Sequence, residues 1–309
     1  MNTSVVLSTY NGRKFIIPQL ESIRKQVRQP DEVLIFDDRS TDDTVELVKK
    51  YIDEHKLNNS WTILVNSENK GWRRNFIEGI WKSSGEIVFT CDQDDIWRSD
   101  KIKVMAGLME EHSEIDLLTS NYAEFNDQET KKPGPWKNDK QLKKLELRQN
   151  YLLVQSPGCT HCISRRLANL SKKYWEPDYP HDALLWRLAG FNNALYIYTD
   201  ALIKWRKHNT SAFSKESKDL KTIGHKKDWI VVAKRFNQTL RQFLGEDVNT
   251  STSRQAKLLR RSTRWLNVRT RFYESRSILT GIKLAFYLDC FPRYRQYLGD
   301  WYLLFIKRK

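Results

Sequence analysis

The stretch EIVFTCDQDDIWRSDK, residues 86–101, joins a run of apolar and β-favouring residues to three carboxylates within four positions. The run EIVFTC predicts a buried β-strand. Asp92, Asp94 and Asp95 follow it at once, and their negative charges repel one another. Such a cluster is either a solvated turn or a place where the protein holds a positively charged group.

Strand-like and helix-like segments alternate through the first 125 residues. The other strand-like runs are SVVLS, EVLIFDD, WTILVN and IDLLTSNYAEF, at residues 4–8, 32–38, 61–66 and 115–125. Between them, apolar residues recur at helical spacing, as at Val45, Val48 and Ile52. The strands are apolar rather than alternately apolar and polar. This pattern predicts an α/β fold with a mixed, largely parallel sheet and helices on both faces.

Two acidic clusters follow strands in this pattern. FDDRS lies at residues 36–40 and CDQDD at residues 91–95. In open α/β sheets, ligands bind beyond the carboxyl ends of the strands, where the strand order reverses. We therefore expect both clusters to project from one edge of the sheet and to face the same ligand.

The residue types in these clusters indicate particular ligands. Asp92 and Asp94 form an Asp-x-Asp at a strand end, and Mg²⁺ and Mn²⁺ prefer carboxylate oxygens. The alternative is an acidic turn that caps the next helix. Asp37 and Asp38 precede residues suited to helix capping, so their own carboxylates are available to a nucleobase or a ribose.

The second half of the chain is less regular. We expect a polar loop at residues 127–140, a helix at 141–154, a strand at 158–164, helices at 165–175 and from 181, strand pairing at 194–208, and helices from 220 onward. The composition changes near residues 211–220. This change predicts an α/β domain over residues 1–215 and a basic α-helical region over residues 216–309.

Positive charge is concentrated at the C-terminal end. Of the net charge of +15, residues 211–309 carry +14, from 22 Lys and Arg against 8 Asp and Glu. A basic block of this kind meets an anionic partner or forms a solvated helical surface. The segment KLAFYLDCFPRYRQYLGDWYLLFIKRK also mixes aromatic and basic residues, which suits an anionic membrane surface.

Several protein classes are disfavoured. The start MNTSVVLSTYNG lacks the features of a signal peptide, and no stretch reaches the roughly 18 apolar residues of a membrane span. Four cysteines are too few for a disulfide scaffold, and the single CxxC of Cys159 and Cys162 is interpreted as packing rather than as a zinc site. We expect a cytoplasmic protein, soluble or attached to the inner face of the cell membrane.

Seven motifs occur in the order found in one enzyme family. They are VVLSTYNG (5–12), DEVLIFDDRSTDDT (31–44), NKGWRRNF (69–76), SSGEIVFTCDQDDIW (83–97), PGCTHCISRRLA (157–168), HDALLW (181–186) and WRKHNTS (205–211). In this order the sequence resembles inverting family 2 glycosyltransferases with the GT-A (Rossmann-like) fold. It looks most like bacterial rhamnosyltransferases of surface polysaccharides. The resemblance covers about residues 3–212.

The resemblance implies a binding site for a nucleotide sugar. dTDP-rhamnose is the implied donor, and a UDP-hexose is the alternative. Seven side chains would contact the donor: Thr9 and Tyr10 at the base, Asp37 and Asp38 at the base or ribose, Arg74 and Asn75 near the phosphates, and Asp92 at the ribose or sugar.

The resemblance also implies a metal site and a catalytic base. Asp94 and His208 would ligate Mn²⁺ or Mg²⁺, and Asp182 would accept the proton of the acceptor hydroxyl. Asp182 is alternatively a helix N-terminal anion, and His208 is alternatively an ordinary edge residue. The sequence departs from the family pattern at Arg39, where glycine is common, and at His181, where an acidic residue is usual.

The implied partners follow from this chemistry. A hexosyltransferase of this kind would act on a lipid-linked or growing cell-surface polysaccharide, at the membrane surface, and a second copy of the chain is a further candidate partner. Two rival classes stay open. A nucleic-acid-binding protein would explain the basic C-terminal region but not the acidic edge. A nucleotidyltransferase would also use carboxylates and a metal, but STYNGRKF is a poor match to its glycine-rich phosphate loop.

Overall fold

The computed structural model describes residues 1–309 except 127–131, 178, 208–221, 246–248 and 308–309. The chain forms two compact units. Unit 1 comprises Met1–Leu145 and Ser156–Lys207, and unit 2 comprises Glu146–Gln155 and His208–Lys309. The boundary expected at residue 215 lies outside the described residues.

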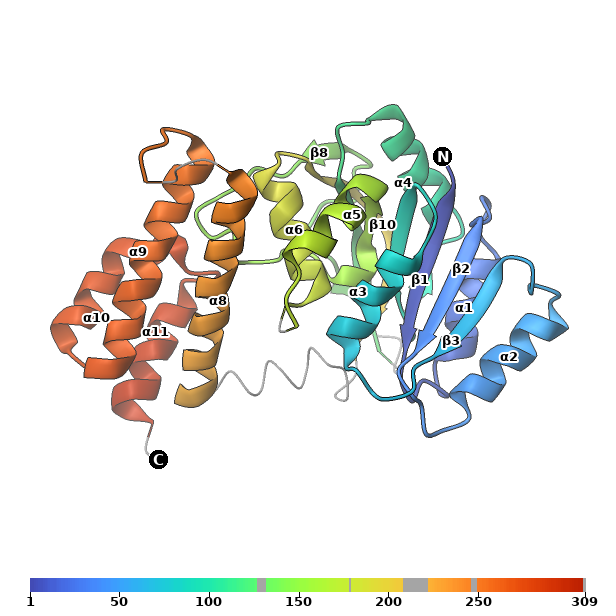
Figure 1. Ribbon diagram of the computed structural model, residues 1–309, viewed down its shortest axis with the longest axis horizontal. Coiled ribbons are helices and arrows are strands. Elements are labelled where there is room, and N and C mark those ends of the chain that lie inside the picture. Colours follow the sequence, from blue (N-terminus) through green and yellow to red (C-terminus); the bar gives the residue numbers. More distant parts are fainter. Residues whose placement is uncertain (127–131, 178, 208–221, 246–248, 308–309) are drawn as a thin grey trace. The chain divides into compact units, whose positions relative to one another are not determined.

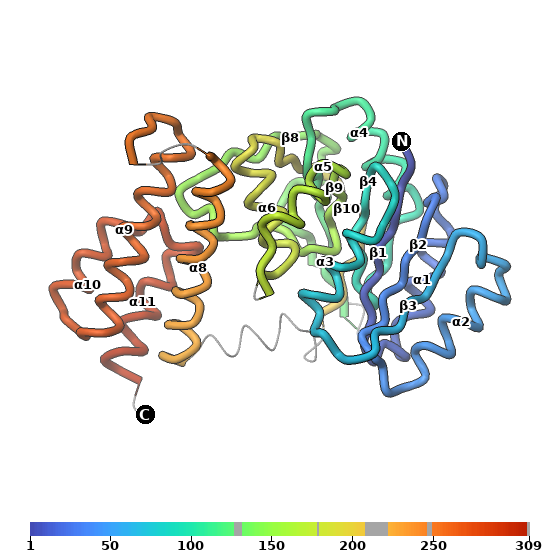
Figure 2. The backbone as a smooth tube through the Cα atoms, viewed as in Figure 1, coloured from blue at the N-terminus to red at the C-terminus, as the bar shows by residue number. Residues whose placement is uncertain are grey.

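Unit 1 is built on a ten-stranded sheet. Its strands are β1 (Thr3–Thr9), β2 (Glu32–Asp37), β3 (Trp61–Val65), β4 (Ile87–Asp92), β5 (Ile96–Trp97), β6 (Leu117–Phe125), β7 (Lys132–Pro133), β8 (Leu142–Lys144), β9 (His161–Ser164) and β10 (Leu195–Arg206). The main order is β3-β2-β1-β4-β9-β6-β10-β5, with β7 on β6 and β8 on β10. Strands β1 to β4 run parallel, whereas β9 lies antiparallel between β4 and β6. Figure 2 traces the chain through β1, β2, β3 and β4.

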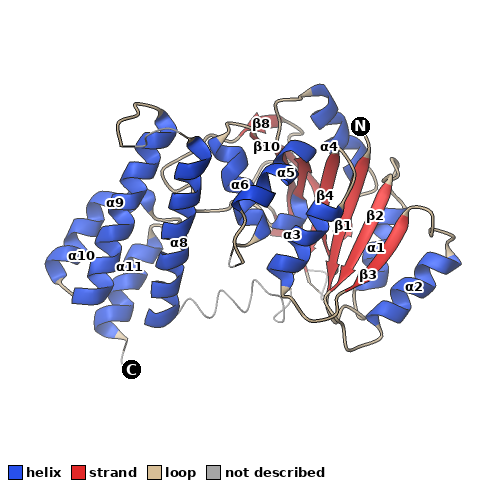
Figure 3. Cartoon of the chain, in the orientation of Figure 1, coloured by secondary structure: helices blue, strands red, loops and turns tan. Residues whose placement is uncertain are grey.

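Helices cover both faces of this sheet (Figures 1 and 3). One core joins the sheet to α1 (Ile16–Arg24), α2 (Thr44–Glu54) and α4 (Lys101–Glu111). On the other face lie α3 (Trp72–Lys82), α5 (Arg165–Tyr174) and α6 (His181–Phe191), which pack on one another and on the sheet. A single 3-10 turn, η1 (Gly158–Thr160), leads into β9. The predicted α/β fold with a mixed sheet is confirmed.

The strand register brings the two acidic clusters to one edge. Thr9 at the end of β1 pairs with Asp37 of β2, and Ser8 pairs with Asp92 of β4. All three strands run in the same direction, so their carboxyl ends meet there. The predicted juxtaposition of the acidic strand ends is therefore confirmed.

The helix expected at residues 141–154 is absent. Leu142–Lys144 instead form β8, because their backbone finds hydrogen-bonding partners in β10, with Leu142 opposite Tyr198. The residues that follow belong to unit 2: the Tyr151 hydroxyl donates to Asn237 Oδ1 (2.5 Å) and Gln149 Nε2 donates to the Leu258 carbonyl (2.9 Å). The apolar residues of this segment pack against other helices rather than forming one.

The regular structure of unit 2 is helical, as predicted (Figure 3). Within its described residues it consists of α8 (Ile223–Leu244), α9 (Arg254–Ser275), α10 (Ile278–Leu284), η2 (Ala285–Cys290), α11 (Arg295–Trp301) and η3 (Tyr302–Ile306). Its core contains Trp265 and an ion pair in which the Arg269 guanidinium donates to both oxygens of Asp300, at 2.7 and 2.8 Å. No helix in the described part of the chain is long and apolar enough to cross a membrane.

Candidate active site

Gln93 joins the end of β1 to the acidic stretch after β4. Its Oε1 accepts hydrogen bonds from Thr9 Oγ1 (2.6 Å) and the Tyr10 amide (2.9 Å), and its Nε2 donates to the Tyr10 carbonyl (3.2 Å). Gly12 makes room for it, since a Cβ at that position would lie 2.2 Å from Gln93 Oε1. Thr9 is thus buried against Gln93, while Tyr10 is 45% exposed at the edge. Gln93 was not predicted as a site residue, although its position between Asp92 and Asp94 is a signal that could have indicated it.

Asp37 and Asp38 shape the loops beside this edge. Asp37 is fully buried and accepts hydrogen bonds from the Ser40 amide (2.8 Å) and hydroxyl (2.5 Å). Asp38 accepts from the backbone amides of Lys70 and Gly71, both at 2.8 Å. Asp38 therefore ties the end of β2 to the loop that leads into α3. Its exposed fraction is 3%.

Arg39, which follows Asp38, has an unusual backbone conformation. Its φ is 63°, in the left-handed region that glycine adopts readily and other residues rarely. The family's usual glycine at this position thus has a physical reason, and Arg39 keeps the turn at the expense of local strain.

Asn75 and Arg74 lie at the start of α3 with different surroundings. Asn75 is 1% exposed, and its Nδ2 donates to Ser8 Oγ (2.7 Å) and the Phe36 carbonyl (2.8 Å). It fixes the helix to the ends of β1 and β2. Arg74 Nε pairs with Glu78 (2.6 Å), and about half of its side chain is exposed. The predicted contact of Arg74 with the phosphates stays a prediction, whereas Asn75 is occupied by the strand ends.

Three side chains lie close together at the Asp-x-Asp motif. Donor or acceptor atoms of Asp92, Asp95 and Cys159 lie within 4.8 Å of one another. Burial and the negative charges of Asp94 and Asp182 together raise the pKa of Asp92 to about 7. Asp95 is 1% exposed, and burial and the negative charges of Asp94 and Asp92 hold its pKa well above its usual range. Crowding these carboxylates together therefore costs electrostatic free energy.

Asp95 and Cys159 have distinct roles in this cluster. Asp95 Oδ1 accepts the Arg206 amide (2.9 Å), while its buried Oδ2 has no hydrogen-bond partner among the described residues. Burial and the adjacent carboxylates raise the pKa of the Cys159 thiol well above its usual range. The thiol therefore stays protonated beside the two carboxylates. The other cysteine of the CxxC, Cys162, is buried in the core against Met109, as expected for a packing residue.

Two cations lie beside the carboxylates, and neither was predicted. Lys101 is fully buried, with Nζ donating to the Cys159 carbonyl (2.9 Å) and lying 4.0 Å from the centre of the Trp97 ring. Burial lowers its pKa. Arg206 Nε donates to the Asp94 carbonyl (2.8 Å). The only signal for Arg206 was its position in the WRKH motif. His208 of that motif, the predicted metal ligand, lies outside the described residues.

Asp182 reaches the same edge from α6. It lies in the first helical turn, where Oδ1 accepts the Ala183 amide (2.7 Å), and its charge acts on both Asp92 and His161. Gly158 lies against it, because a Cβ there would be 3.1 Å from Asp182 Cβ. The predicted base and the acidic strand end, which are 90 residues apart in the sequence, are therefore neighbours in space.

His181 packs beneath Asp182 as an uncharged aromatic ring. It stacks on Phe76 at a centroid distance of 4.2 Å and meets Trp72 edge-on at 5.9 Å. Burial lowers its pKa to about 3. Burial likewise lowers the pKa of the adjacent His161 to about 3. The departure from the family's acidic residue thus places a neutral ring at this position.

The carboxylate cluster fits a hard divalent cation. Asp92 and Asp95 offer carboxylate oxygens within 4.8 Å of each other, and one buried oxygen of Asp95 lacks a partner among the described residues. The protonated thiol of Cys159 is suited to orienting these carboxylates rather than to binding Mg²⁺ or Mn²⁺. Asp94 is not part of the converging trio, so its role as a metal ligand stays a prediction.

Comparison with known proteins places the chain in a family. The fold has the GT-A-like architecture of glycosyltransferases. The model of the family described as Glycosyl transferase family 2 matches residues 4–175, which is more than half of the chain. The chain therefore belongs to glycosyl transferase family 2. The family prediction is confirmed, while the rhamnosyltransferase subgroup stays a prediction.

Individual relatives match parts of the chain. Over 121 residues it is 36% identical to poly(ribitol-phosphate) β-N-acetylglucosaminyltransferase TarS of Staphylococcus aureus, which covers 38% of this chain and 20% of TarS. Over 220 residues it is 24% identical to an uncharacterized glycosyltransferase of Haemophilus influenzae, covering 68% of this chain and 67% of that protein. The matched stretch thus spans only about a fifth of the length of TarS.

Solved structures share the fold. A crystal structure of S. aureus TarS 1-349 in complex with UDP has a TM-score of 0.60 at 20% identity, covering 99% of this chain and 81% of that one. Mannosyltransferase PcManGT from Pyrobaculum calidifontis, in complex with GDP-Man and Mn²⁺, has a TM-score of 0.52 at 15% identity, covering 99% and 88%. At these identities the likeness establishes the fold alone.

Proposed function

We propose that the protein is an inverting glycosyltransferase that moves a sugar from a nucleoside diphosphate donor to a hydroxyl group. The observation that carries this proposal is the meeting of Asp182 with the strand-end carboxylates around Asp92. A single carboxylate from a separate helix, set beside a donor edge, is the arrangement that a one-step displacement requires. No covalent intermediate on the enzyme is needed.

In the proposed reaction, Asp182 accepts the proton of the acceptor hydroxyl as its oxygen attacks the anomeric carbon. The bond from that carbon to the donor phosphate breaks, and the nucleoside diphosphate leaves with the electron pair. The packing of Gly158 against Asp182 orients the carboxylate for this transfer. Asp92 is placed to accept a hydrogen bond from the ribose or the donor sugar.

The nucleotide would lie along the ends of β1, β2 and β4. Tyr10, exposed at the edge, would line the base, with Thr9 and Gln93 fixing its loop. Asp37 and Asp38 would position the base and ribose through the loops that they hold. Arg74 would face the phosphates, and Asn75 would hold α3 at the strand ends for this purpose.

A divalent cation, Mn²⁺ or Mg²⁺, would be held by Asp94 and the adjoining carboxylates, with His208 as a further ligand. When bound, it stabilises the negative charge that develops on the leaving diphosphate. The unpartnered Asp95 oxygen and the raised pKa of Asp92 support a cation at this position, because both penalties are relieved by a positive charge.

Two donors are proposed. The motif order favours dTDP-rhamnose. The 36% identity to TarS over 121 residues favours a UDP-sugar as the second candidate. The two candidates share the chemistry above and differ in the base and sugar pockets.

The acceptor is proposed to be a lipid-linked or growing cell-surface polysaccharide, reached at the inner face of the cell membrane. Ten of the fifteen large apolar side chains exposed in the described part of the chain lie between Ile278 and Ile306. Basic residues are interspersed with them, as at Lys283, Arg293 and Arg295. Exposed apolar and basic side chains together suit an anionic membrane surface. A second copy of the chain is the alternative cover for this surface.

The test is donor hydrolysis and sugar transfer by the purified full chain, with a panel of nucleotide sugars and Mn²⁺. Asp182→Ala and Asp94→Ala should each lower the rate at least about 100-fold, because a catalytic base contributes roughly 10²–10⁴-fold. Asp53→Ala, which removes an exposed carboxylate of α2, is the matched control and should retain full activity. Full activity of either test variant would remove the role assigned to that residue.

A further inference from the structure

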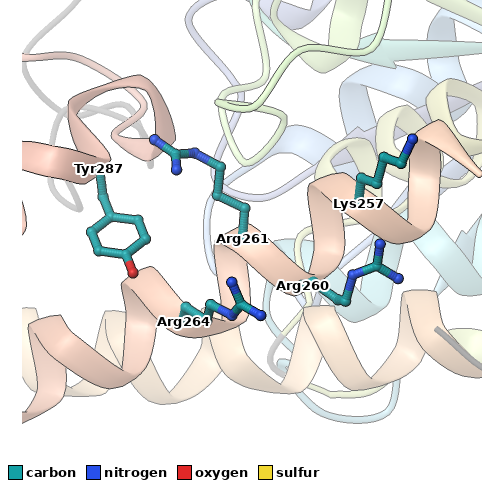
Figure 4. A pocket seen from close by; sticks show the side chains of 5 residues that line it. All are labelled: Lys257, Arg260, Arg261, Arg264 and Tyr287. Atoms are coloured by element: carbon teal, nitrogen blue, oxygen red, sulfur yellow. The ribbon is translucent and has the colours of Figure 1, made fainter. Parts of the chain in front are cut away.

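A basic cleft on α9 lies entirely within unit 2 and has no place in the proposed transfer reaction. Lys257, Arg260, Arg261 and Arg264 line it, and Tyr287 of η2 closes one side (Figure 4). The four cations occupy one face of the helix, because their spacings are three, four and seven residues. The cleft has a volume of about 170 Å³.

The charges in this cleft are only partly neutralised by the chain itself. Arg261 is paired with Asp289, at 2.8 and 2.7 Å, and also donates to the Phe286 carbonyl at 2.7 Å. Lys257 and Arg264 are exposed and form no ion pair with the described residues. Like charges at helical spacing destabilise a helix. An anion bound in the cleft would remove this repulsion.

The size of the cleft limits what it holds. Its volume of about 170 Å³ is smaller than the roughly 300–1,000 Å³ of sites that enclose drug-sized ligands. A nucleotide or a sugar chain would not be enclosed. A single phosphate group fits the volume, and arginine side chains bind phosphate oxygens through several hydrogen bonds at once.

The surroundings indicate which phosphate. Tyr287 is flanked in the chain by Phe286, which is 76% exposed, and Leu288, which is 42% exposed. The preceding helix α10 exposes Leu279 (72%) and Ile282 (52%). Leu279, Ile282 and Leu288 are aliphatic and offer no ring on which a nucleobase could stack, whereas a lipid brings a phosphate headgroup and hydrocarbon together.

We propose that the α9 cleft binds the phosphate of an anionic lipid headgroup, while the exposed side chains of η2 and α10 enter the adjoining apolar layer. This inference rests on the membrane association proposed above and adds a defined headgroup site to it. The cleft residues then set the affinity for a phosphate-bearing membrane rather than for any negatively charged surface.

The test is co-sedimentation of the full chain with vesicles of phosphatidylcholine, with and without phosphatidic acid. Lys257→Ala/Arg264→Ala should weaken binding to the phosphatidic acid vesicles by at least about tenfold, since each basic residue near an anionic surface contributes about a factor of five. Lys227→Ala/Arg271→Ala removes one exposed Lys and one exposed Arg of unit 2 outside the cleft. This control should lose less than about threefold.

The outcomes separate the two proposals. If the unaltered chain does not bind the phosphatidic acid vesicles, the membrane proposal and the cleft inference both fall. If it binds them and the two double variants lose affinity equally, membrane association stands and the cleft inference is overturned. Thermal melting of each variant tests whether the fold is retained.

A soluble competitor distinguishes the sources of phosphate. Single-stranded DNA, a phosphodiester polymer without a lipid, should not displace the chain from vesicles at physiological salt. If DNA binds the unaltered chain tightly and Lys257→Ala/Arg264→Ala abolishes that binding, the ligand is a polymer phosphate and the lipid assignment is wrong. Phe286→Ser should weaken vesicle binding but leave any binding of inorganic phosphate unchanged.

Discussion

Two buried carboxylates, Asp95 in unit 1 and Asp300 in unit 2, are held in opposite ways. Both oxygens of Asp300 accept hydrogen bonds from Arg269, and the Tyr273 hydroxyl adds another at 2.6 Å. Asp95 receives one backbone hydrogen bond, and its second oxygen has no partner among the described residues. The negative charge of Asp300 is therefore balanced by groups within the fold. One oxygen of Asp95 has no such partner among the described residues and is available to a bound ligand.

The same contrast extends to the neighbours of each carboxylate. Around Asp95 lie Asp92 and Asp94, which raise its pKa, and the ring nitrogens of the buried His181, next to Asp182 in the chain, have no hydrogen-bond partner among the described residues. Around Asp300, the Arg269 guanidinium lies 5.0 to 5.4 Å from the centres of three aromatic rings. The two surroundings therefore differ in charge, because like charges crowd Asp95 whereas an opposite charge meets Asp300.

The largest effect is expected at the compensated carboxylate. Asp300→Asn leaves the guanidinium of Arg269 buried with no opposite charge, and breaking a buried pair from one side costs about 3–5 kcal/mol. Chemical denaturation should show a loss of this size in the free energy of unfolding. Asp289→Asn breaks the exposed pair with Arg261 on the same helix and should cost less than about 1 kcal/mol. Equal losses would contradict the comparison.

A pH effect should appear at the uncompensated edge. Burial lowers the pKa of His181 to about 3, so the folded state keeps the ring neutral while the unfolded chain is protonated below about pH 6.5. Stability from this group is full above pH 6.5 and is lost as the pH falls toward 3. Between pH 6.5 and 5 the loss is about 2 kcal/mol for one histidine.

His181→Phe keeps the stacking on Phe76 and removes the titration. Thermal melting at pH 7.5 and pH 5 should show a smaller drop for this variant than for the unaltered chain. His55→Gln changes an exposed histidine and should leave the drop unchanged. A drop that stays the same in His181→Phe would show that His181 is accessible to protons in the folded state.

The same substitution should have the opposite sign at the two carboxylates. Asp95→Asn removes a negative charge from a crowded buried cluster, so it should leave stability unchanged or raise it by about 1 kcal/mol. The rise in melting temperature on adding Mn²⁺ should shrink, because ligand binding to the folded state supplies that rise. A destabilisation as large as that of Asp300→Asn would mean that Asp95 is compensated without a metal.

The smallest effect is expected at Arg39. Its left-handed backbone carries a penalty of roughly 1–2 kcal/mol, and a glycine removes this penalty but makes the unfolded chain more flexible by up to about 1 kcal/mol. Arg39→Gly should therefore raise the free energy of unfolding by about 1 kcal/mol or less. Arg39→Ala, which keeps the penalty, should give no gain. Equal gains in both variants would assign the effect to the side chain.

Local sequence patterns predicted the parallel strands of the sheet. Apolar runs ending in acidic residues marked β2 and β4, and parallel pairing then placed Asp37 and Asp92 at one edge. The helix expected at residues 141–154 was wrong, because β10 offers the backbone of β8 a partner that no local pattern reveals. The exposed residues of unit 2 likewise follow from tertiary packing.

The positions of Asp37, Asp38, Asp92 and Asp94 after strands were enough to predict that they face a ligand. The resemblance alone supplied the role of Asp182, since 90 residues separate it from Asp92. Lys101 looks like an ordinary residue at the start of a helix, and only its complete burial next to Cys159 sets it apart. The contacts of Cys159 and Arg206 with the carboxylates depend on long-range packing, which composition and spacing do not encode.

Residues 146–155 belong to unit 2, although the residues on either side of them belong to unit 1, and this limits how the chain can be recombined. The chain crosses between the units three times, at Leu145, at Gln155 and after Lys207. A chimera that exchanges the C-terminal helices at a single junction would therefore separate Tyr151 from its partner Asn237. Any recombination that exchanges the helices of unit 2 between relatives must therefore carry this ten-residue segment with them, which makes unit 2 harder to exchange than a simple C-terminal domain.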